Sequence, residues 1–83
     1  MITKISGIGA FPGNKIFIKN SEERLIGSSV VTLNCTFEID IFDIISNSLL
    51  YITEIDKNNN LINRICINFP SNEDLWKFVK ISE

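Results

Sequence analysis

The longest regular pattern in the chain runs from Val30 to Ile41, where apolar and polar residues alternate over twelve positions. Alternating side chains lie on opposite faces only in an extended strand, because a helix would distribute them around its circumference. The pattern therefore predicts one long β-strand. A strand of this length would span about 40 Å, roughly twice the usual length, so it should bend and be shared by two sheets or by two sides of a small barrel.

Shorter strand patterns occur on both sides of this segment. They cover residues 2–8, 15–19, 24–27, 49–56 and 61–69. Turn signals separate them: Phe11–Asn14 contains the Pro-Gly pair of a type II turn, and Lys57–Asn60 contains three Asn residues that tolerate a positive φ. These patterns predict a mainly antiparallel curled sheet or small barrel of five to six strands.

The C-terminal part of the chain shows the pattern of a helix from Asn72 to Lys80. Pro70 ends the preceding strand and Ser71 can cap the helix. The apolar stripe of this helix consists of Leu75, Phe78 and Val79, with Trp76 beside it. The predicted fold class is therefore α+β, with one C-terminal helix packed on the sheet. A second short helical turn, over Asp40 to Ile45, is the main alternative to an extended end of the long strand.

Length and composition predict one domain over residues 1–83, since 45% hydrophobic and 22% charged residues are typical of a folded chain. Two cysteines, Cys35 and Cys66, are fewer than a disulfide framework uses, so both are expected as reduced thiols in or near the core. No apolar run has the length of a signal peptide or of a membrane span. We therefore expect a cytoplasmic protein that does not enter a membrane.

The charges are unevenly distributed along the chain. The net charge is -2, which argues against direct nucleic-acid binding because such domains usually carry a basic excess. Between Cys35 and Asp56 there are five carboxylates and no Lys or Arg, so this window sums to -5. Three of these carboxylates, Glu38, Asp40 and Asp43, form a cluster at the end of the long alternating segment. The first two would lie on one strand face.

The residues of most enzymes and metal sites are missing from the sequence. There is no histidine, which removes the commonest general base and zinc ligand. Gly7-Ile8-Gly9 lacks the third glycine of a dinucleotide-binding loop. Asp56, Asn58 and Asn60 have part of the spacing of a calcium loop, without its glycine and its closing glutamate. We expect a protein that is not an enzyme and that uses no cofactor or metal.

Charge asymmetry without catalytic residues favours a small binding protein of inhibitor or antitoxin type. In size and character, with no motif matched, the chain resembles bacterial immunity proteins and phage anti-defence proteins. The acidic surface of Glu38, Asp40 and Asp43 would engage a basic partner, such as a nuclease or another nucleic-acid-handling enzyme. Tyr51 and Trp76 are the further candidates for partner binding, because amphipathic aromatic residues are common in interface hot spots.

Two alternatives come from other functional classes. The first is a small β-barrel, similar to OB-type or SH3-like barrels, that binds nucleic acid or a saccharide through one face. Lys15, Lys19 and Arg64 would supply positive charge to such a face, but the sequence does not make its aromatic partners evident. The second is a structural domain that forms a homo-oligomer by pairing an exposed β edge with copies of itself.

Overall fold

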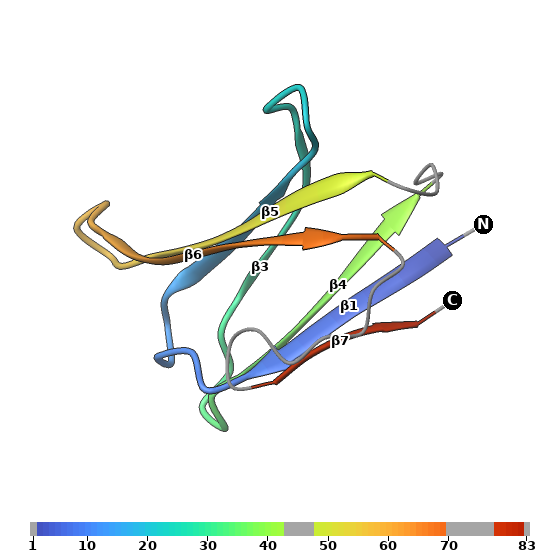
Figure 1. The fold of residues 1–83 in the computed structure, drawn as a ribbon. Helices are drawn as coiled ribbons and strands as arrows, with labels where there is room; N and C mark the ends of the chain where they lie inside the picture. The colour runs from blue at the N-terminus through green and yellow to red at the C-terminus, as the bar shows by residue number, and fades with distance from the viewer. Residues whose placement is uncertain (1, 43–47, 70–77, 83) are drawn as a thin grey trace.

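The computed structural model describes residues 2–42, 48–69 and 78–82, and all regular elements in these ranges are strands. The strands are β1 (Ile2–Ile8), β2 (Lys15–Lys19), β3 (Leu25–Val30), β4 (Thr36–Phe42), β5 (Leu49–Ile55), β6 (Leu61–Asn68) and β7 (Phe78–Ser82). They form one sheet of order β4-β1-β7 and a second sheet of order β3-β2-β5-β6 (Figure 1). Every described strand pairing is antiparallel.

The hydrophobic core consists of side chains from alternate positions of the strands in both sheets. In β4, for example, Phe37, Ile39 and Ile41 are buried while the residues between them are exposed. The other buried apolar residues on strands are Ile5, Ile16, Ile18, Leu50, Ile52 and Ile67. Burying one such side chain contributes about 1.5–3 kcal/mol, so this two-sided core is the main source of stability in the described part of the chain.

The predicted helix from Asn72 to Lys80 is wrong where the structure describes it. Phe78–Ser82 forms β7, which pairs with β1 from Phe78 opposite Ile8 to Ser82 opposite Lys4. Residues 70–77, which include Trp76, lie outside the described residues. Pairing with β1 satisfies the backbone groups along that strand, and a short apolar run with β-branched residues fits a strand as readily as a helix.

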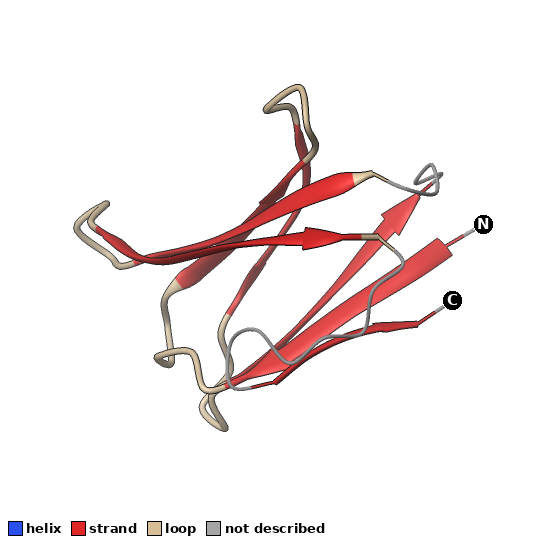
Figure 2. Cartoon of the chain, in the orientation of Figure 1, coloured by secondary structure: helices blue, strands red, loops and turns tan. Residues whose placement is uncertain are grey.

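The predicted fold class, α+β, is therefore wrong. Figure 2 shows strands and loops but no helix among the described residues. The described part of the chain also contains seven strands rather than five to six. Of the alternative helical turn over Asp40 to Ile45, residues 40–42 belong to β4 and the rest lies outside the described residues.

The predicted single strand from Val30 to Ile41 is also wrong, because two strands of different sheets share this segment. β3 ends at Val30, and β4 begins at Thr36. Between them the Thr32 Oγ1 accepts hydrogen bonds from the backbone N–H groups of Asn34 and Thr36, each at 3.3 Å. Such side-chain bonds stabilise a turn in competition with a strand. The chain thus passes from one sheet to the other through a tight loop rather than a continuous bend.

β3 and β4 pack closely where the two sheets meet. A Cβ atom placed on Gly27 of β3 would lie 2.6 Å from Cγ2 of Ile39 on β4. No ordinary side chain fits at that distance, so the absence of a side chain at Gly27 permits the close approach of the sheets.

The two predicted turns are confirmed. In Phe11–Asn14 the Asn14 N–H donates to the Phe11 carbonyl at 3.1 Å, and Gly13 has a φ of 87°. In the β5–β6 hairpin, Asn59 has a φ of 64°. Both turns lie at the same end of the second sheet, because β2 begins and the antiparallel β5 ends there.

Candidate functional site

The outer face of the second sheet carries basic and aromatic side chains together. Alternate residues of β2 and β5, such as Ile16, Ile18 and Ile52, are fully buried in the core. Their neighbours along each strand must therefore point outward. We term six of the outward side chains of this sheet the basic aromatic face: Lys15, Phe17, Lys19, Tyr51, Thr53 and Arg64.

Strand register brings these side chains next to one another. Phe17 of β2 lies opposite Thr53 of β5, and Thr53 lies opposite Arg64 of β6. Lys19 lies opposite Tyr51. The Arg64 guanidinium carbon is 4.9 Å from the centroid of the Tyr51 ring, within the range of a cation–π contact. The face is thus one continuous surface across three strands.

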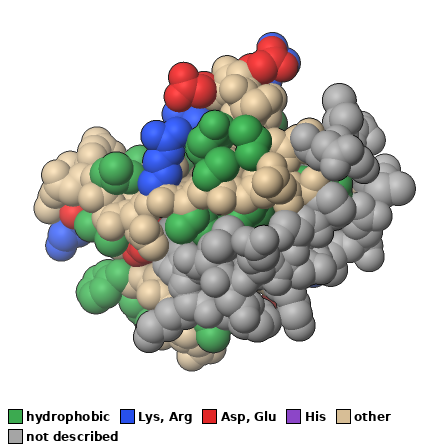
Figure 3. All heavy atoms as spheres, in the orientation of Figure 1, with side chains coloured by type: hydrophobic (Ala, Val, Ile, Leu, Met, Phe, Trp, Pro, Cys, Tyr) green, Lys and Arg blue, Asp and Glu red, His purple; other side chains and the backbone are tan. Residues whose placement is uncertain are grey.

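Two shallow depressions adjoin Phe17 on this face. One, of about 260 Å³, is lined by Phe17, Lys19, Leu25, Thr53 and Ile55. The other, of about 240 Å³, is lined by Lys15, Phe17, Ser28, Ser29 and Val30. In Figure 3, Lys and Arg side chains lie beside hydrophobic ones over β5. The half-buried Phe17 ring borders both depressions, which gives each an apolar wall next to a lysine.

The strands of this sheet contain three cations, Lys15, Lys19 and Arg64, which lie on the outward face. They contain one carboxylate, Glu54, and its side chain points inward. Glu54 is 3% exposed. Its Oε2 accepts hydrogen bonds from the Phe11 backbone N–H at 2.9 Å and from Asn14 Nδ2 at 2.7 Å. Glu54 therefore anchors the Phe11–Asn14 turn to β5 and adds no negative side chain to the basic aromatic face.

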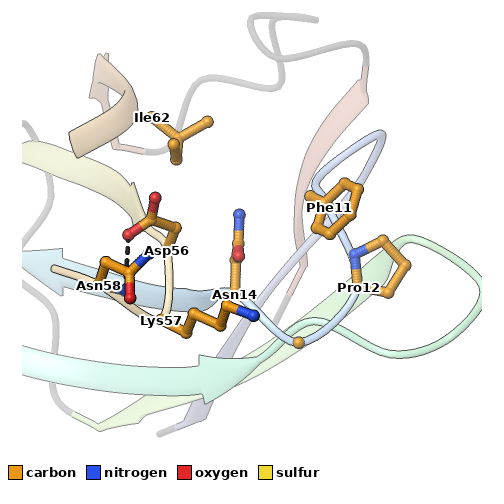
Figure 4. A pocket seen from close by; sticks show the side chains of 8 residues that line it. Phe11, Pro12, Asn14, Asp56, Lys57, Asn58 and Ile62 are labelled. Carbon is orange, nitrogen blue, oxygen red and sulfur yellow. Dashed lines mark hydrogen bonds between the residues drawn. The ribbon is translucent and has the colours of Figure 1, made fainter. Parts of the chain in front are cut away.

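A larger pocket of about 490 Å³ lies at the end of the sheet, between the Phe11–Asn14 turn and the β5–β6 hairpin. Figure 4 shows Phe11 and Pro12 on one side of it and Ile62 and the hairpin residues on the other, with Asn14 between them. The pocket is lined by Phe11, Pro12, Gly13, Asn14, Asp56, Lys57, Asn58 and Ile62. Apolar walls with a few polar groups at the rim are typical of ligand sites.

The carboxylate of Asp56, which lines this pocket, is already engaged in hydrogen bonds within its own hairpin. Its Oδ1 accepts hydrogen bonds from the backbone N–H groups of Asn58 and Asn60, both at 2.8 Å. The bond from the Asn60 N–H is the main cause that lowers the pKa of Asp56. The partial calcium-loop spacing is thus used for a hairpin turn. Within the described ranges no three His, Cys, Asp or Glu side chains are grouped as metal ligands would be.

The predicted acidic site is brought together only in part. Glu38 and Asp40 are both exposed on the outer side of β4. Lys4 of β1 lies opposite Asp40, and its Nζ is 3.4 Å from Oε2 of Glu38, so this surface includes a cation. Tyr51 lies on the outer face of the other sheet and does not join it. The remaining predicted residues, Asp43 and Trp76, lie outside the described residues.

Cys35 and Cys66 are free thiols, and their burial differs from the prediction. Cys35 is half-buried in the loop before β4, where it has a φ of 63°. Cys66 is exposed on β6, so its assignment to the core region is wrong. Tyr51 and Cys66 are cross-strand partners, which places Cys66 at the border of the basic aromatic face.

Phe17 was not among the residues predicted for the surface, because a phenylalanine at strand spacing is usually part of the core. A signal was present: in Lys15-Ile-Phe17-Ile-Lys19 the aromatic residue shares its face with two lysines. Because lysine is almost never fully buried, this alternation indicates that Phe17 lies on the outer face.

Comparison with known proteins identifies no relative: no family model, curated protein or solved structure matches the chain. In the part of the chain that the structure describes, no helix is long and apolar enough to cross a lipid bilayer.

Proposed function

We propose that this protein binds single-stranded nucleic acid through the basic aromatic face. This is the nucleic-acid-binding alternative raised from the sequence, with the surface placed on one of two antiparallel sheets rather than on a barrel. The observation that carries it is the grouping of Lys15, Lys19 and Arg64 with Phe17 and Tyr51 on one outward side of a sheet. Proteins that bind single strands combine cations for the phosphates with aromatic rings on which bases stack.

Single strands suit this face better than duplexes. Phe17 and Tyr51 lie half-buried on the outward face of the sheet, and stacking of bases on such rings requires bases whose planes are accessible. The depressions beside Phe17 are shallow and lie next to Lys15 and Lys19, so a base and its neighbouring phosphate would find complementary groups side by side. With three cations and a chain net charge of -2, we expect moderate affinity that falls steeply with salt.

The acidic surface of β4 supports the inhibitor hypothesis less well. Lys4 pairs with Glu38 and lies opposite Asp40, so two described carboxylates share one cation. A cluster of carboxylates attracts a basic partner most strongly when no cations lie among them. The inhibitor hypothesis stays a prediction, and the basic aromatic face has the stronger support.

Self-association through the basic aromatic face is disfavoured by charge. A symmetric face-to-face dimer would bring Lys15, Lys19 and Arg64 of one copy against those of the other. Like charges in close contact cost several kcal/mol at an interface. The same three cations that oppose a second copy would favour a polyanion.

The proposal is tested by fluorescence anisotropy of a labelled oligothymidylate at about 20 mM salt, an ionic strength at which screening is weak. Phe17→Leu keeps an apolar side chain but removes the ring, and should weaken binding about fivefold or more. Lys19→Ala and Arg64→Ala should also weaken it. Matched controls lie on the other sheet: Lys4→Ala and Phe42→Ala, which change exposed residues, should leave affinity within about twofold.

Two results would count against the proposal. One is the absence of binding by the wild-type protein at this salt concentration. The other is equal weakening by the Lys4 and Lys19 variants, which would indicate a general charge effect rather than a site on the second sheet. Circular dichroism of each variant shows whether the β structure is retained.

A further inference from the structure

We infer that the pocket between the Phe11–Asn14 turn and the β5–β6 hairpin holds one base of the bound strand. The inference rests on the proposed function and adds a defined base site to it. The pocket lies at the end of the sheet where β2 begins with Lys15, a residue of the basic aromatic face. Asn14, which lines the pocket, precedes Lys15 in the chain; Asp56, on the opposite wall, follows Ile55; and Lys15 pairs with Ile55 across the sheet. A nucleic-acid strand that lies over β2 and β5 would therefore run toward the end of the sheet at which the pocket lies.

The pocket offers apolar surface that is accessible to a flat ring. The Phe11 side chain is 70% exposed and that of Ile62 is 51% exposed, although both are large apolar groups. Figure 4 places these two side chains on opposite sides of the opening. A nucleobase has two apolar faces and could be inserted between such walls, gaining the stacking energy that aromatic residues give to single strands.

Polar groups at the rim match the other parts of a nucleotide. Lys57 lines the pocket and carries a positive charge for a phosphate next to the inserted base. Asn58 lines the same rim, and an amide side chain can both donate to and accept from the edge of a base. The combination of a ring wall, an amide and an ammonium group fits a nucleotide better than a purely apolar ligand.

The walls of the pocket are held in place before any ligand binds. Glu54 bonds both to the Phe11 N–H and to the Asn14 side chain, and the Val31 N–H donates to the Asn14 carbonyl at 2.9 Å. On the opposite wall, Asp56 fixes the hairpin through the Asn58 and Asn60 N–H groups. A preformed site loses little conformational entropy on binding.

The test measures anisotropy of the same labelled oligothymidylate with Phe11→Ala and with Ile62→Ala. Phe11→Ala should lower affinity about fivefold or more, and Ile62→Ala should lower it in the same direction. Phe42 is the matched control, because its side chain is 67% exposed on β4 of the other sheet, and Phe42→Ala should change affinity less than twofold. Both phenylalanines are exposed, so truncation should leave the core intact.

The outcomes separate this inference from the proposed function. If the wild-type protein binds and Phe17→Leu weakens binding while Phe11→Ala and Ile62→Ala do not, the base pocket is wrong and the basic aromatic face stands. If the wild-type protein does not bind the oligonucleotide, the proposed function fails, and the pocket inference fails with it. Weakening by the Phe11 and Phe17 variants, with the Phe42 variant unchanged, supports both.

Discussion

At the residue scale, single side chains determine how closely the sheets approach and how the turns close. Gly27 permits contact between β3 and β4 because any Cβ there would meet Ile39. Thr32 closes the loop between the sheets through its hydroxyl oxygen, and Asp56 closes the β5–β6 hairpin through its carboxylate. These roles depend on contacts between particular atoms, which cannot be predicted from the pattern of hydrophobic and polar positions.

Gly27→Ala should destabilise the protein by about 1–3 kcal/mol, since the added methyl group overpacks the contact with Ile39. The free energy of unfolding from urea denaturation measures this effect. Ser28→Ala, at the neighbouring exposed position, is the control and should change stability by less than about 0.5 kcal/mol. Equal stability of Gly27→Ala and wild type would show that the sheets do not meet as described.

Asp56 should titrate below its ordinary pKa of 3.8, because the Asn60 N–H and its other hydrogen-bond donors favour the charged form. A pKa lowered by folding stabilises the native state above the unfolded value of 3.8, and this stabilisation is lost as the pH falls through the folded pKa. NMR titration of the carboxyl carbon measures the value directly, and a pKa at or above 3.8 would contradict the hairpin geometry.

Asp56→Asn provides the matching stability test. The variant keeps a side-chain oxygen acceptor but cannot ionise. It should be less stable than the wild type near neutral pH, and the difference should shrink as the pH falls through the lowered pKa of wild-type Asp56, where its carboxylate becomes protonated. A difference that is independent of pH would assign the effect to something other than the charge.

At the scale of elements, strands with clear alternation and turns with distinctive residues were predictable. β1 and β2 have the predicted bounds, and Pro12-Gly13 closes the predicted turn. Two elements were not predictable from local pattern. The segment from Val30 to Ile41 alternates across a loop, because the Thr32 hydroxyl closes a turn without interrupting the alternation. The segment Phe78–Ser82 forms a strand because its backbone pairs with β1, which is distant in the sequence.

Glu54 links two elements, and its removal should loosen the Phe11–Asn14 turn. Glu54→Ala would leave the Phe11 N–H and the Asn14 amide without their acceptor, at a cost of about 2–3 kcal/mol. Glu54→Gln keeps one carbonyl oxygen and should cost less. Urea denaturation measures both variants, and hydrogen exchange at the Phe11 amide reports the turn itself. Unchanged exchange in Glu54→Ala would contradict the anchoring role.

At the scale of the whole molecule, the structure separates charges that the linear sequence mixes. The acidic middle of the chain divides into exposed Glu38 and Asp40 on one sheet and buried Glu54 on the other. Basic residues that are far apart in sequence, such as Lys19 and Arg64, lie on one face of the sheet, with Lys19 opposite Tyr51 and Arg64 opposite Thr53. The chain therefore has a net charge of -2 although one of its faces carries three cations, and the position of that face follows from the sheet topology rather than from the composition. This is why the sequence alone drew attention to the acidic residues of β4 and did not locate this face.

The affinity for single-stranded DNA should fall with salt in proportion to the cations on this face. Three cations predict a slope of log K against log salt concentration of about -2, since each neutralised phosphate contributes about -0.7 on single strands. Lys19→Ala should make the slope less negative by about 0.7, and Lys4→Ala should leave it unchanged. Anisotropy titrations at several salt concentrations measure the slopes, and a slope near zero would exclude phosphate contacts by these cations.

Binding at the basic aromatic face is tested most directly by a map of backbone amide chemical shifts during titration with an oligothymidylate. We expect the changes to concentrate on β2, β5 and β6, at and around Phe17, Tyr51 and Arg64, while β4 around Glu38 is unaffected. Shift changes confined to β4 and β1, or no changes at low salt with saturating oligonucleotide, would contradict binding at the basic aromatic face.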